Sequence, residues 1–289
     1  MPLSAATDGF RLAHDRHGVP GAPPVLLLHG WPGDRTDMTA VAELLTPGHD
    51  VVVPDLRGFG GADKHDHDPT EQYSAAAQAR SLAALLGELD LSEVVVAGYD
   101  VGSRVGQQLA KDHPELLRAL VVTPPAPGVG RRILDEQPMR EFWYQSFHQL
   151  DLARELVDGD ARATRAYLRH FWSHWSGPGF TPDDERLDHL TTVYGAPGAF
   201  VASVNWYRSG GGAVARSLAE TAPDPADRIT VPTTLLWPEH DPLFPRAWSD
   251  RVGEFFAEVT VTAVDGVGHF VPVEAPRVFA DAVAAAAAR

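Results

Sequence analysis

Short apolar runs alternate along the first part of the chain with longer segments of helical periodicity. The apolar runs predict buried strands at residues 24–28, 51–54, 93–97 and 117–122. Between the last three of these runs, residues 73–89 and 102–113 repeat apolar positions at the spacing of an amphipathic helix. Because continuous apolar strands that alternate with helices form parallel sheets buried on both faces, the pattern predicts an α/β fold.

The pattern changes in the middle of the chain and then returns. Residues 124–130 read Pro-Pro-Ala-Pro-Gly-Val-Gly, which is the composition of a linker. The following segment is helical in character and rich in aromatic residues. A second linker at residues 221–225 leads to apolar runs that predict strands at 233–237 and 259–264, and an alanine-rich helix closes the chain.

The two linkers divide the chain into three segments. We predict a core formed by residues 1–128 and 222–289, with a helical cap at residues 129–221. A helical segment inserted between two halves of a parallel sheet is expected to lie over the active site as a lid.

Composition and charge narrow the class of function. With 44% hydrophobic and 22% charged residues, the chain is an ordinary globular protein, and its formal charge of −15 disfavours nucleic acid and anionic membrane surfaces. The absence of cysteine excludes disulfides, thiolate catalysis and cysteine metal sites. No secretory signal is visible, and the apolar runs are too short to span a membrane, so we expect a cytoplasmic protein.

The most informative motif follows the third predicted strand. Residues 98–102 read Gly-Tyr-Asp-Val-Gly, placing Asp100 between two glycines at a strand-to-helix turn. This is the nucleophile-elbow pattern with aspartate in place of serine. The turn is so tight that side chains at the glycine positions would clash. On its own the motif is equally compatible with an aspartate that caps the following helix.

An earlier loop supplies a candidate oxyanion hole. Residues 29–33 read His-Gly-Trp-Pro-Gly and directly follow the first predicted strand. We expect the backbone N–H groups of Trp31 and of Val101, the residue after the candidate nucleophile, to be the donors.

The downstream loops supply a candidate base and its orienting acid. His269 follows the last predicted strand, and Asp241 follows the strand before it. The resulting order of nucleophile, acid and histidine is the order typical of α/β-hydrolases. Glu239 and His240 compete locally with Asp241. We favour Asp241 because Asp-Pro at this spacing resembles the acid loop of the fold.

Together these motifs resemble the α/β-hydrolase superfamily over nearly the whole chain. The resemblance implies a mostly parallel eight-stranded sheet with helices on both faces and an inserted all-helical cap. Residues 144–149 read Tyr-Gln-Ser-Phe-His-Gln and residues 205–208 read Asn-Trp-Tyr-Arg. Both match the lid-tyrosine motifs of epoxide hydrolases, so the resemblance implies that Tyr144 and Tyr207 bind the oxygen of an epoxide.

Dehalogenases with an aspartate nucleophile are the alternative. Haloalkane dehalogenases place a halide-binding Trp after the nucleophile, where this chain has Val101. Fluoroacetate dehalogenases carry a His-Trp pair where this chain has Tyr144-Gln145. The chain also departs from the epoxide hydrolase pattern: Tyr99 replaces a common His and Pro238 replaces a common Gly, which leaves the local geometry around Asp100 and Asp241 open.

The resemblance implies a two-step mechanism. Asp100 attacks an epoxide carbon to form an ester, and a neutral His269, oriented by Asp241, activates water to hydrolyse it. Activity is then expected to decline at low pH as His269 protonates. We further expect His29, Trp31 and Trp206 to contact a small apolar epoxide. Water is the second substrate, no metal or cofactor is implied, and a homodimer is possible.

Overall fold

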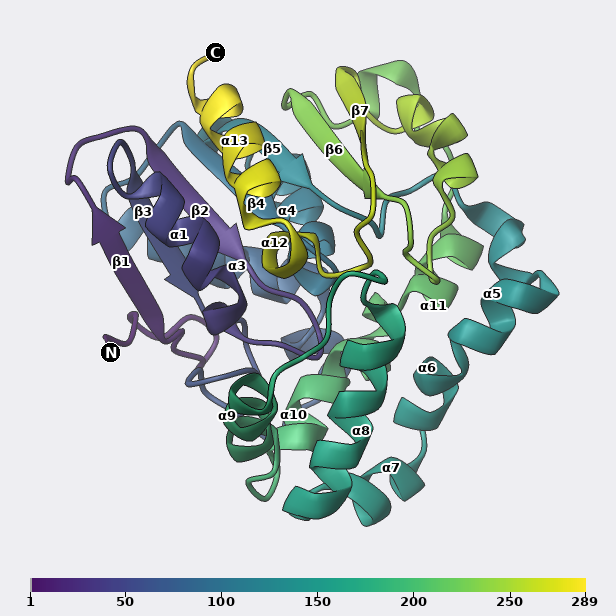
Figure 1. Ribbon diagram of the computed structural model, residues 1–289. Helices are drawn as coiled ribbons and strands as arrows, with labels where there is room; N and C mark the ends of the chain where they lie inside the picture. The colour runs from purple at the N-terminus through teal and green to yellow at the C-terminus, as the bar shows by residue number, and fades with distance from the viewer. Residues whose placement is uncertain (1) are drawn as a thin grey trace.

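The computed structural model describes residues 2–289 and forms an α/β sheet with a helical cap (Figure 1). The sheet has seven strands in the order β1-β3-β2-β4-β5-β6-β7, all parallel except β1, which is antiparallel to β3. The strands are β1 His14–Gly18, β2 Pro24–Leu28, β3 Asp50–Pro54, β4 Val94–Gly98, β5 Leu117–Val122, β6 Thr233–Pro238 and β7 Val259–Val264. The mostly parallel sheet and the six strands expected from apolar runs are confirmed.

The number of strands was overestimated by one. Instead of an eighth strand, the chain before β1 makes only isolated bridges, Leu3 with Ala13 and Thr7 with Phe10. Most of this segment is polar or exposed, so it lacks the apolar side chains that a further strand would pack against the core.

Helices cover both faces of the sheet. Helices α1 (Thr39–Leu45) and α13 (Pro276–Ala287) pack together on one face, next to the short helix α12 (Val271–Glu274). Helices α3 (Ala75–Glu88) and α4 (Val101–Asp112) pack together on the other face. The central strands β3, β4 and most of β2 are completely buried between these layers, which explains their continuous apolar sequences.

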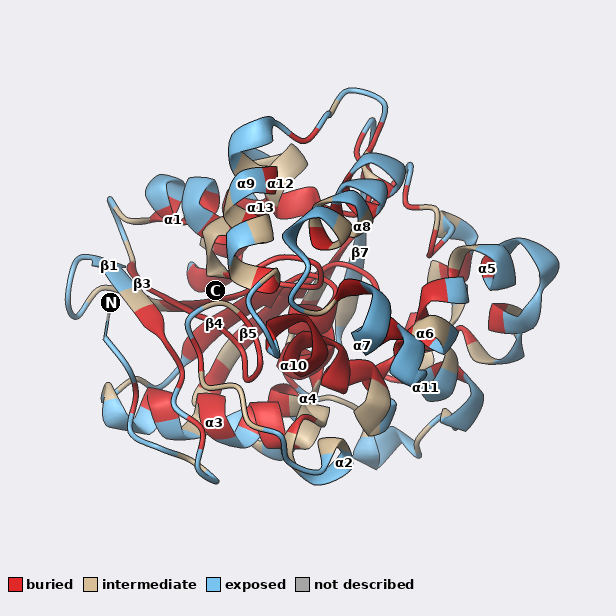
Figure 2. Ribbon diagram, turned by 90° about the horizontal axis from the view of Figure 1, so that it is seen from below, coloured by how far each residue is buried: buried red, intermediate tan, exposed pale blue. Residues whose placement is uncertain are grey.

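Between β5 and β6 the chain forms the helices that we call the cap. In Figure 1 they run from teal to green and lie to one side of the sheet. The cap helices are α5 Glu136–Glu141, α6 Trp143–His148, α7 Asp151–Val157, α8 Ala161–Trp175, α9 Asp184–Tyr194, α10 Ala199–Trp206 and α11 Ala213–Ala219. Helix α10 is buried at every position, as its uniform red colour in Figure 2 shows, so it lies inside the molecule rather than on its surface.

The remaining elements are short. A helix α2 (Pro69–Gln72) and a 3₁₀ turn at Arg35–Met38 lie in loops of the core. No helix within residues 2–289 combines the length and the apolar character that crossing a bilayer requires.

Candidate active site

The turn between β4 and α4 has the geometry of a nucleophile elbow. Asp100 lies at its tip with φ 49° and ψ −116°, a conformation that residues with side chains rarely adopt. A Cβ on Gly102 would lie 2.4 Å from the carbonyl oxygen of Leu28, and a Cβ on Gly98 would lie 2.8 Å from the carbonyl carbon of Gly102. Both glycines are therefore required for the close approach of strand and helix.

The side chain of Asp100 does not cap its own helix. Although Asp100 occupies the N-cap position of α4, it makes no capping hydrogen bond. Its Oδ1 instead accepts a hydrogen bond of 2.7 Å from the backbone N–H of Trp31. This geometry excludes the interpretation of Asp100 as a capping residue. The second expected donor, Val101, is the first residue of α4 and lies beside the carboxylate.

His269 lies between two carboxylates. Its Nδ1 is 2.9 Å from Oδ2 of Asp241, and its Nε2 is 3.4 Å from Oδ2 of Asp100. The backbone N–H of His269 donates to the carbonyl of Trp175, which fixes the loop beneath the cap. Asp241 is held in turn by the N–H of Leu243, 2.8 Å from its Oδ1. The structure thus brings Asp100, His269 and Asp241 together as the sequence predicted.

The local competitors of Asp241 are directed elsewhere. Glu239 accepts the backbone N–H of Gly266 at 2.8 Å, and the His240 side chain lies near Glu239 on the surface. Pro238 is the last residue of β6 and stands where epoxide hydrolases commonly have a glycine. It does not prevent Asp241 from contacting His269.

The two carboxylates determine the charge of His269. Burial alone would lower the pKa of its imidazole, but the charges of Asp241 and Asp100 and their contacts raise that pKa to about 10. The resting site therefore holds an imidazolium, whereas the sequence analysis expects a neutral ring in the step that activates water. Among the described residues its Nε2 makes no hydrogen bond closer than the 3.4 Å contact with Asp100, so this atom faces the nucleophile.

Two phenols face Asp100 from the cap. Tyr144 is on α6 and Tyr207 directly follows α10, and their rings meet edge to face with centroids 5.6 Å apart. Burial raises the pKa of both hydroxyls well above the usual value, and the negative charge of Asp100 and a neighbouring phenol add to the effect. Both therefore stay protonated at neutral pH. The side-chain amide of Gln145 donates to the Tyr144 hydroxyl at 3.1 Å, so that oxygen is already an acceptor and its proton is free to be donated.

A small cavity lies between the carboxylate and the phenols. Asp100, Arg104, Tyr144, Trp206 and Tyr207 are part of its wall. The volume open to the centre of a water molecule is about 10 Å³, room for about one water. A substrate therefore requires side chains of the cavity wall to move.

Of the three residues expected to contact substrate, Trp206 alone lines this cavity. The Trp31 ring stacks on the ring of Tyr144, with centroids 5.6 Å apart and planes 1° apart. The ring of His29 bonds the carbonyl of Gly30 at 3.0 Å and the N–H of Leu56 at 3.0 Å. Both nitrogens of His29 are thus used by the backbone, and this geometry corrects its expected role to one of holding the loop.

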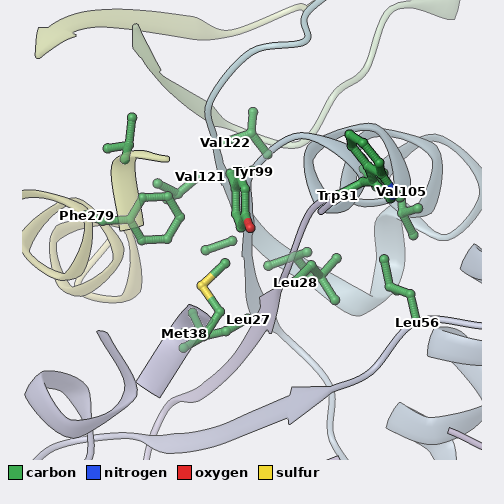
Figure 3. Close-up of a cluster of buried hydrophobic side chains, with 14 of the residues drawn as sticks. Leu27, Leu28, Trp31, Met38, Leu56, Tyr99, Val105, Val121, Val122 and Phe279 are labelled. Atoms are coloured by element: carbon green, nitrogen blue, oxygen red, sulfur yellow. The ribbon is translucent and has the colours of Figure 1, made fainter. Parts of the chain in front are cut away.

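Tyr99 directly precedes the nucleophile, at the position where a histidine is common, and it connects the elbow to the cap. It is fully buried among apolar side chains that include Leu28 and Met38 (Figure 3). Its hydroxyl donates to Oδ2 of Asp37 at 2.6 Å, and the other oxygen of Asp37 accepts from Arg186 of α9. Burial raises the pKa of Asp37 to about 6, although Arg186 opposes the shift.

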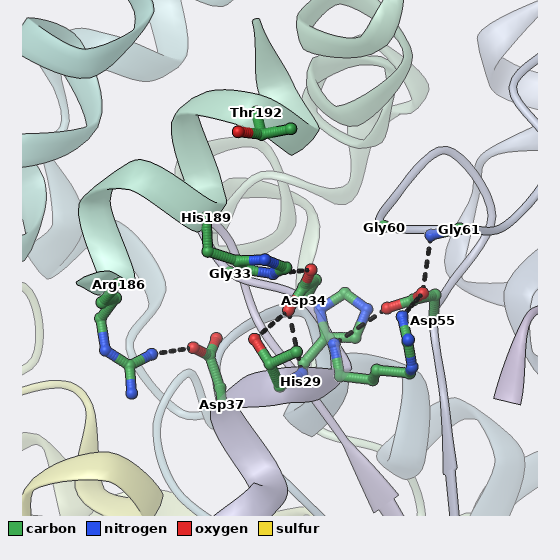
Figure 4. Close-up of polar contacts among 12 residues, drawn as sticks. His29, Gly33, Asp34, Asp37, Asp55, Gly60, Gly61, Arg186, His189 and Thr192 are labelled. Carbon is green, nitrogen blue, oxygen red and sulfur yellow. Dashed lines mark hydrogen bonds and ion pairs between the residues drawn. The ribbon is translucent and has the colours of Figure 1, made fainter. Parts of the chain in front are cut away.

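The loop after β2 makes further contacts with the cap. Figure 4 shows Arg186 and His189 of α9 directed at Asp37 and Asp34, the latter pair 2.8 Å apart. The indole N–H of Trp172 also donates to the carbonyl of Pro32 at 3.0 Å. The loop that carries Trp31 is thus fixed from the cap side.

Sequence reasoning missed Gln145, Arg104 and the Asp37–Arg186 pair as parts of the site. Gln145 belongs to the Tyr-Gln-x-x-x-Gln motif, so a signal for it was present. Arg104 follows Asp100 by one helical turn, which also places it near the site. Asp37 and Arg186 are 149 residues apart, and nothing in the sequence pairs them.

The chain is similar to known proteins over most of its length. The chain is 27% identical over 288 residues to the soluble epoxide hydrolase of Corynebacterium sp. (strain C12), covering 96% of this chain and 93% of that protein. It is 31% identical over 193 residues to a fluoroacetate dehalogenase of Burkholderia sp., covering 65% of this chain and 63% of that protein. The solved structure of the epoxide hydrolase CorEH without ligand matches with a TM-score of 0.83 at 25% identity, covering 98% of this chain and 97% of that one.

A family model described as the alpha/beta hydrolase fold matches residues 23–276. That range includes the elbow, the loop of Trp31, the cap and the loops of Asp241 and His269. This chain therefore belongs to the family of the alpha/beta hydrolase fold.

Proposed function

We propose that the protein is an epoxide hydrolase that converts an epoxide to a vicinal diol through an ester on Asp100. One observation carries the proposal: a carboxylate at a strained turn contacts a backbone N–H and an imidazole, and faces two buried phenols across a cavity. The similarity to epoxide hydrolases supports it.

In the first step an oxygen of Asp100 forms a bond to an epoxide carbon as the carbon–oxygen bond of the ring breaks. The departing oxygen takes a proton from Tyr144 or Tyr207, whose raised pKa values keep them protonated until that moment. The product is an alkyl ester of the enzyme with a neighbouring hydroxyl.

The first step also prepares the base. Ester formation removes the negative charge of Asp100, one of the charges that raise the pKa of His269. The pKa of His269 then falls, and the proton that the ring releases restores the tyrosinate left by the first step. Once neutral, the ring can take a proton from water through Nε2. The water attacks the ester carbonyl, the N–H groups of Trp31 and Val101 stabilise the oxyanion, and the diol leaves with one oxygen from Asp100.

A single turnover in ¹⁸O-labelled water with enzyme in excess tests the covalent route. The first diol from styrene oxide should carry no label, and the label should remain in the peptide that contains Asp100. Label in the first diol would mean that water attacks the epoxide directly. His269→Ala should accumulate the ester, seen as a mass increase equal to the epoxide.

Substitution of the phenols tests the proposed proton donors. The double variant Tyr144→Phe with Tyr207→Phe should lose epoxide opening. Tyr167→Phe is the matched control, because that cap hydroxyl contacts His148 at 2.9 Å instead of facing the cavity. Equal activity in the double variant and this control would remove the phenols from the mechanism.

A dehalogenase that uses the same nucleophile is the second candidate. The similarity to a fluoroacetate dehalogenase favours it. Halide release from haloacetates, measured beside diol formation from epoxides, separates the two activities.

A further inference from the structure

The cavity between Asp100 and the two phenols, which we call the inner cavity, lies below the surface of the protein. Every residue of its wall is buried, and the volume open to the centre of a water molecule is about 10 Å³. Room for about one water is too little for the smallest organic epoxide. The structure therefore describes a closed form, and an organic substrate reaches Asp100 only in an open one.

A larger cavity, which we call the outer cavity, adjoins the inner one. Its volume by the same measure is about 300 Å³. Its wall includes Lys111, Ala219 and Thr221, which are exposed, so this cavity is accessible from solvent. Arg104 belongs to the walls of both cavities. Its side chain is therefore part of the partition between solvent and the nucleophile.

Helix α11 forms another part of this partition. Ala213, its first residue, lines the inner cavity, whereas Arg216 and Ala219 line the outer cavity. A displacement of this one helix therefore changes the walls of both cavities. Helix α4, which carries Arg104, packs against α3, β4 and β5 and holds the elbow, so it cannot move without disrupting the site.

The chain on either side of α11 permits a displacement. Three glycines, residues 210–212, precede the helix, and the linker at residues 221–225 follows it. Gly210 has a φ of 80°, and no atom lies within 4 Å of the place that its Cβ would take. The N–H of Val214 donates to Gln145 at 3.1 Å, and the hydroxyl of Ser217 is buried without a hydrogen-bond partner among residues 2–289. Because glycine has the greatest backbone freedom, residues 210–212 can act as a hinge.

We propose that the substrate enters through the outer cavity, and that α11 moves about residues 210–212 to admit it. The passage opens between α11 and the fixed helix α4, beside the side chain of Arg104. Because a bulky epoxide needs a wider opening than a small one, the residues of α11 that line the outer cavity select substrates by size. The inference rests on the proposed function in one respect, namely that Asp100 reacts with an organic substrate.

Obstruction of the outer cavity tests the route. Ala219→Trp adds a large side chain to its wall at an exposed position, where the substitution should not disturb the fold. The kcat/KM for trans-stilbene oxide should fall by about tenfold or more relative to the kcat/KM for propylene oxide. Ala166→Trp is the matched control, because Ala166 is exposed on the cap helix α8 and lines only surface grooves there. A ratio that Ala219→Trp leaves unchanged, or that Ala166→Trp lowers equally, would overturn the route.

Gly210→Asn tests the hinge. Asparagine tolerates a positive φ better than most residues with a side chain, and its Cβ would meet no atom within 4 Å, so the closed form is retained. The backbone loses freedom, which should lower the kcat/KM for trans-stilbene oxide by about 2- to 5-fold. Gly198→Asn is the matched control, since Gly198 has a φ of 82° and equally open surroundings at the start of α10. No loss in Gly210→Asn, or an equal loss in Gly198→Asn, would refute the hinge at residues 210–212.

A thiol probe separates the route from the epoxide chemistry. The chain has no cysteine, so Ala213→Cys introduces a single thiol into the wall of the inner cavity. Its reaction with N-ethylmaleimide should be slowed when Ala219→Trp is added and unchanged when Ala166→Trp is added. If no epoxide yields a diol but the labelling follows this pattern, the route stands and the proposed function is wrong. A thiol that does not react, or whose labelling rate is the same with either tryptophan, would overturn the inference.

Discussion

Replacement of Gly102 by alanine is expected to damage both the stability and the chemistry of the site. The new Cβ would lie 2.4 Å from the carbonyl oxygen of Leu28 and 2.5 Å from that of His29, whereas ordinary contact begins at 3.4 Å. All of these neighbours are backbone atoms, so no side-chain rotation relieves the clash. Helix α4 and the end of β2 must therefore separate by about 1 Å.

The displacement acts directly on the candidate oxyanion hole. Trp31 follows β2 by three residues, and its N–H lies 2.7 Å from Asp100. A separation of about 1 Å lengthens this hydrogen bond beyond the range in which it is effective. The loss of one such donor lowers kcat by about 10²–10³, and the strain should cost about 1–3 kcal/mol of unfolding free energy.

Gly106→Ala is the control, since it makes the same substitution one turn further along α4. Its Cβ would meet the ends of two side chains, Leu120 at 3.2 Å and Val96 at 3.4 Å, which can shift. Alanine also gains about 1 kcal/mol of helix propensity over glycine, which offsets that contact. Urea unfolding and kcat at saturating epoxide measure both effects. A Gly102→Ala enzyme with wild-type kcat and stability would refute this account of the elbow, as would equal damage in Gly106→Ala.

Three further outcomes are expected. The pKa of His269 is raised to about 10, so the protonated ring contributes fully to the free energy of unfolding below about pH 6.5, and this contribution is lost as the pH rises through 10. In His269→Gln, the free energy of unfolding measured in urea should therefore depend less on pH between pH 6 and pH 10. Gln145→Leu removes the amide donor to Tyr144 and should lower kcat about tenfold in the diol assay. The melting temperature should also fall, because Oε1 of Gln145 accepts the backbone N–H of Val214. Arg186→Gln leaves Asp37 buried without its cation and should lower the free energy of unfolding by about 3–5 kcal/mol at pH 8. This loss should be smaller at pH 5, because Asp37 is protonated there.

Sequence patterns predicted the central strands because those strands are buried on both faces. Val94–Gly98 is apolar at every position, and the structure buries every position. The edge strand His14–Gly18 was not predicted, since it is mostly polar and only its first residue is buried. Its strand conformation comes from antiparallel pairing with β3, a contact that local periodicity does not encode.

The site was partly predictable for a similar reason. Asp100 lies in a motif whose two glycines are dictated by local backbone geometry, so five consecutive residues carry the signal. The charge of His269 in the resting site could not be predicted, because it depends on two carboxylates contributed by distant loops. The environment of Arg104 was equally hidden: its spacing from Asp100 is visible in sequence, but the lack of a hydrogen-bond partner for its Nε within residues 2–289 is a property of the folded chain.

The contacts with the cap explain how a tyrosine can stand at position 99, where a histidine is common. Asp37 is fully buried, where an unpaired negative charge is costly. The Tyr99 hydroxyl and the Arg186 guanidinium each bind one oxygen of Asp37, and Arg186 supplies a compensating positive charge. Because Arg186 belongs to α9, the neutralisation of Asp37 depends on the cap being in place. The cap therefore makes two contributions: it presents two phenols to the nucleophile, and it neutralises the buried carboxylate that binds Tyr99, the residue before the nucleophile.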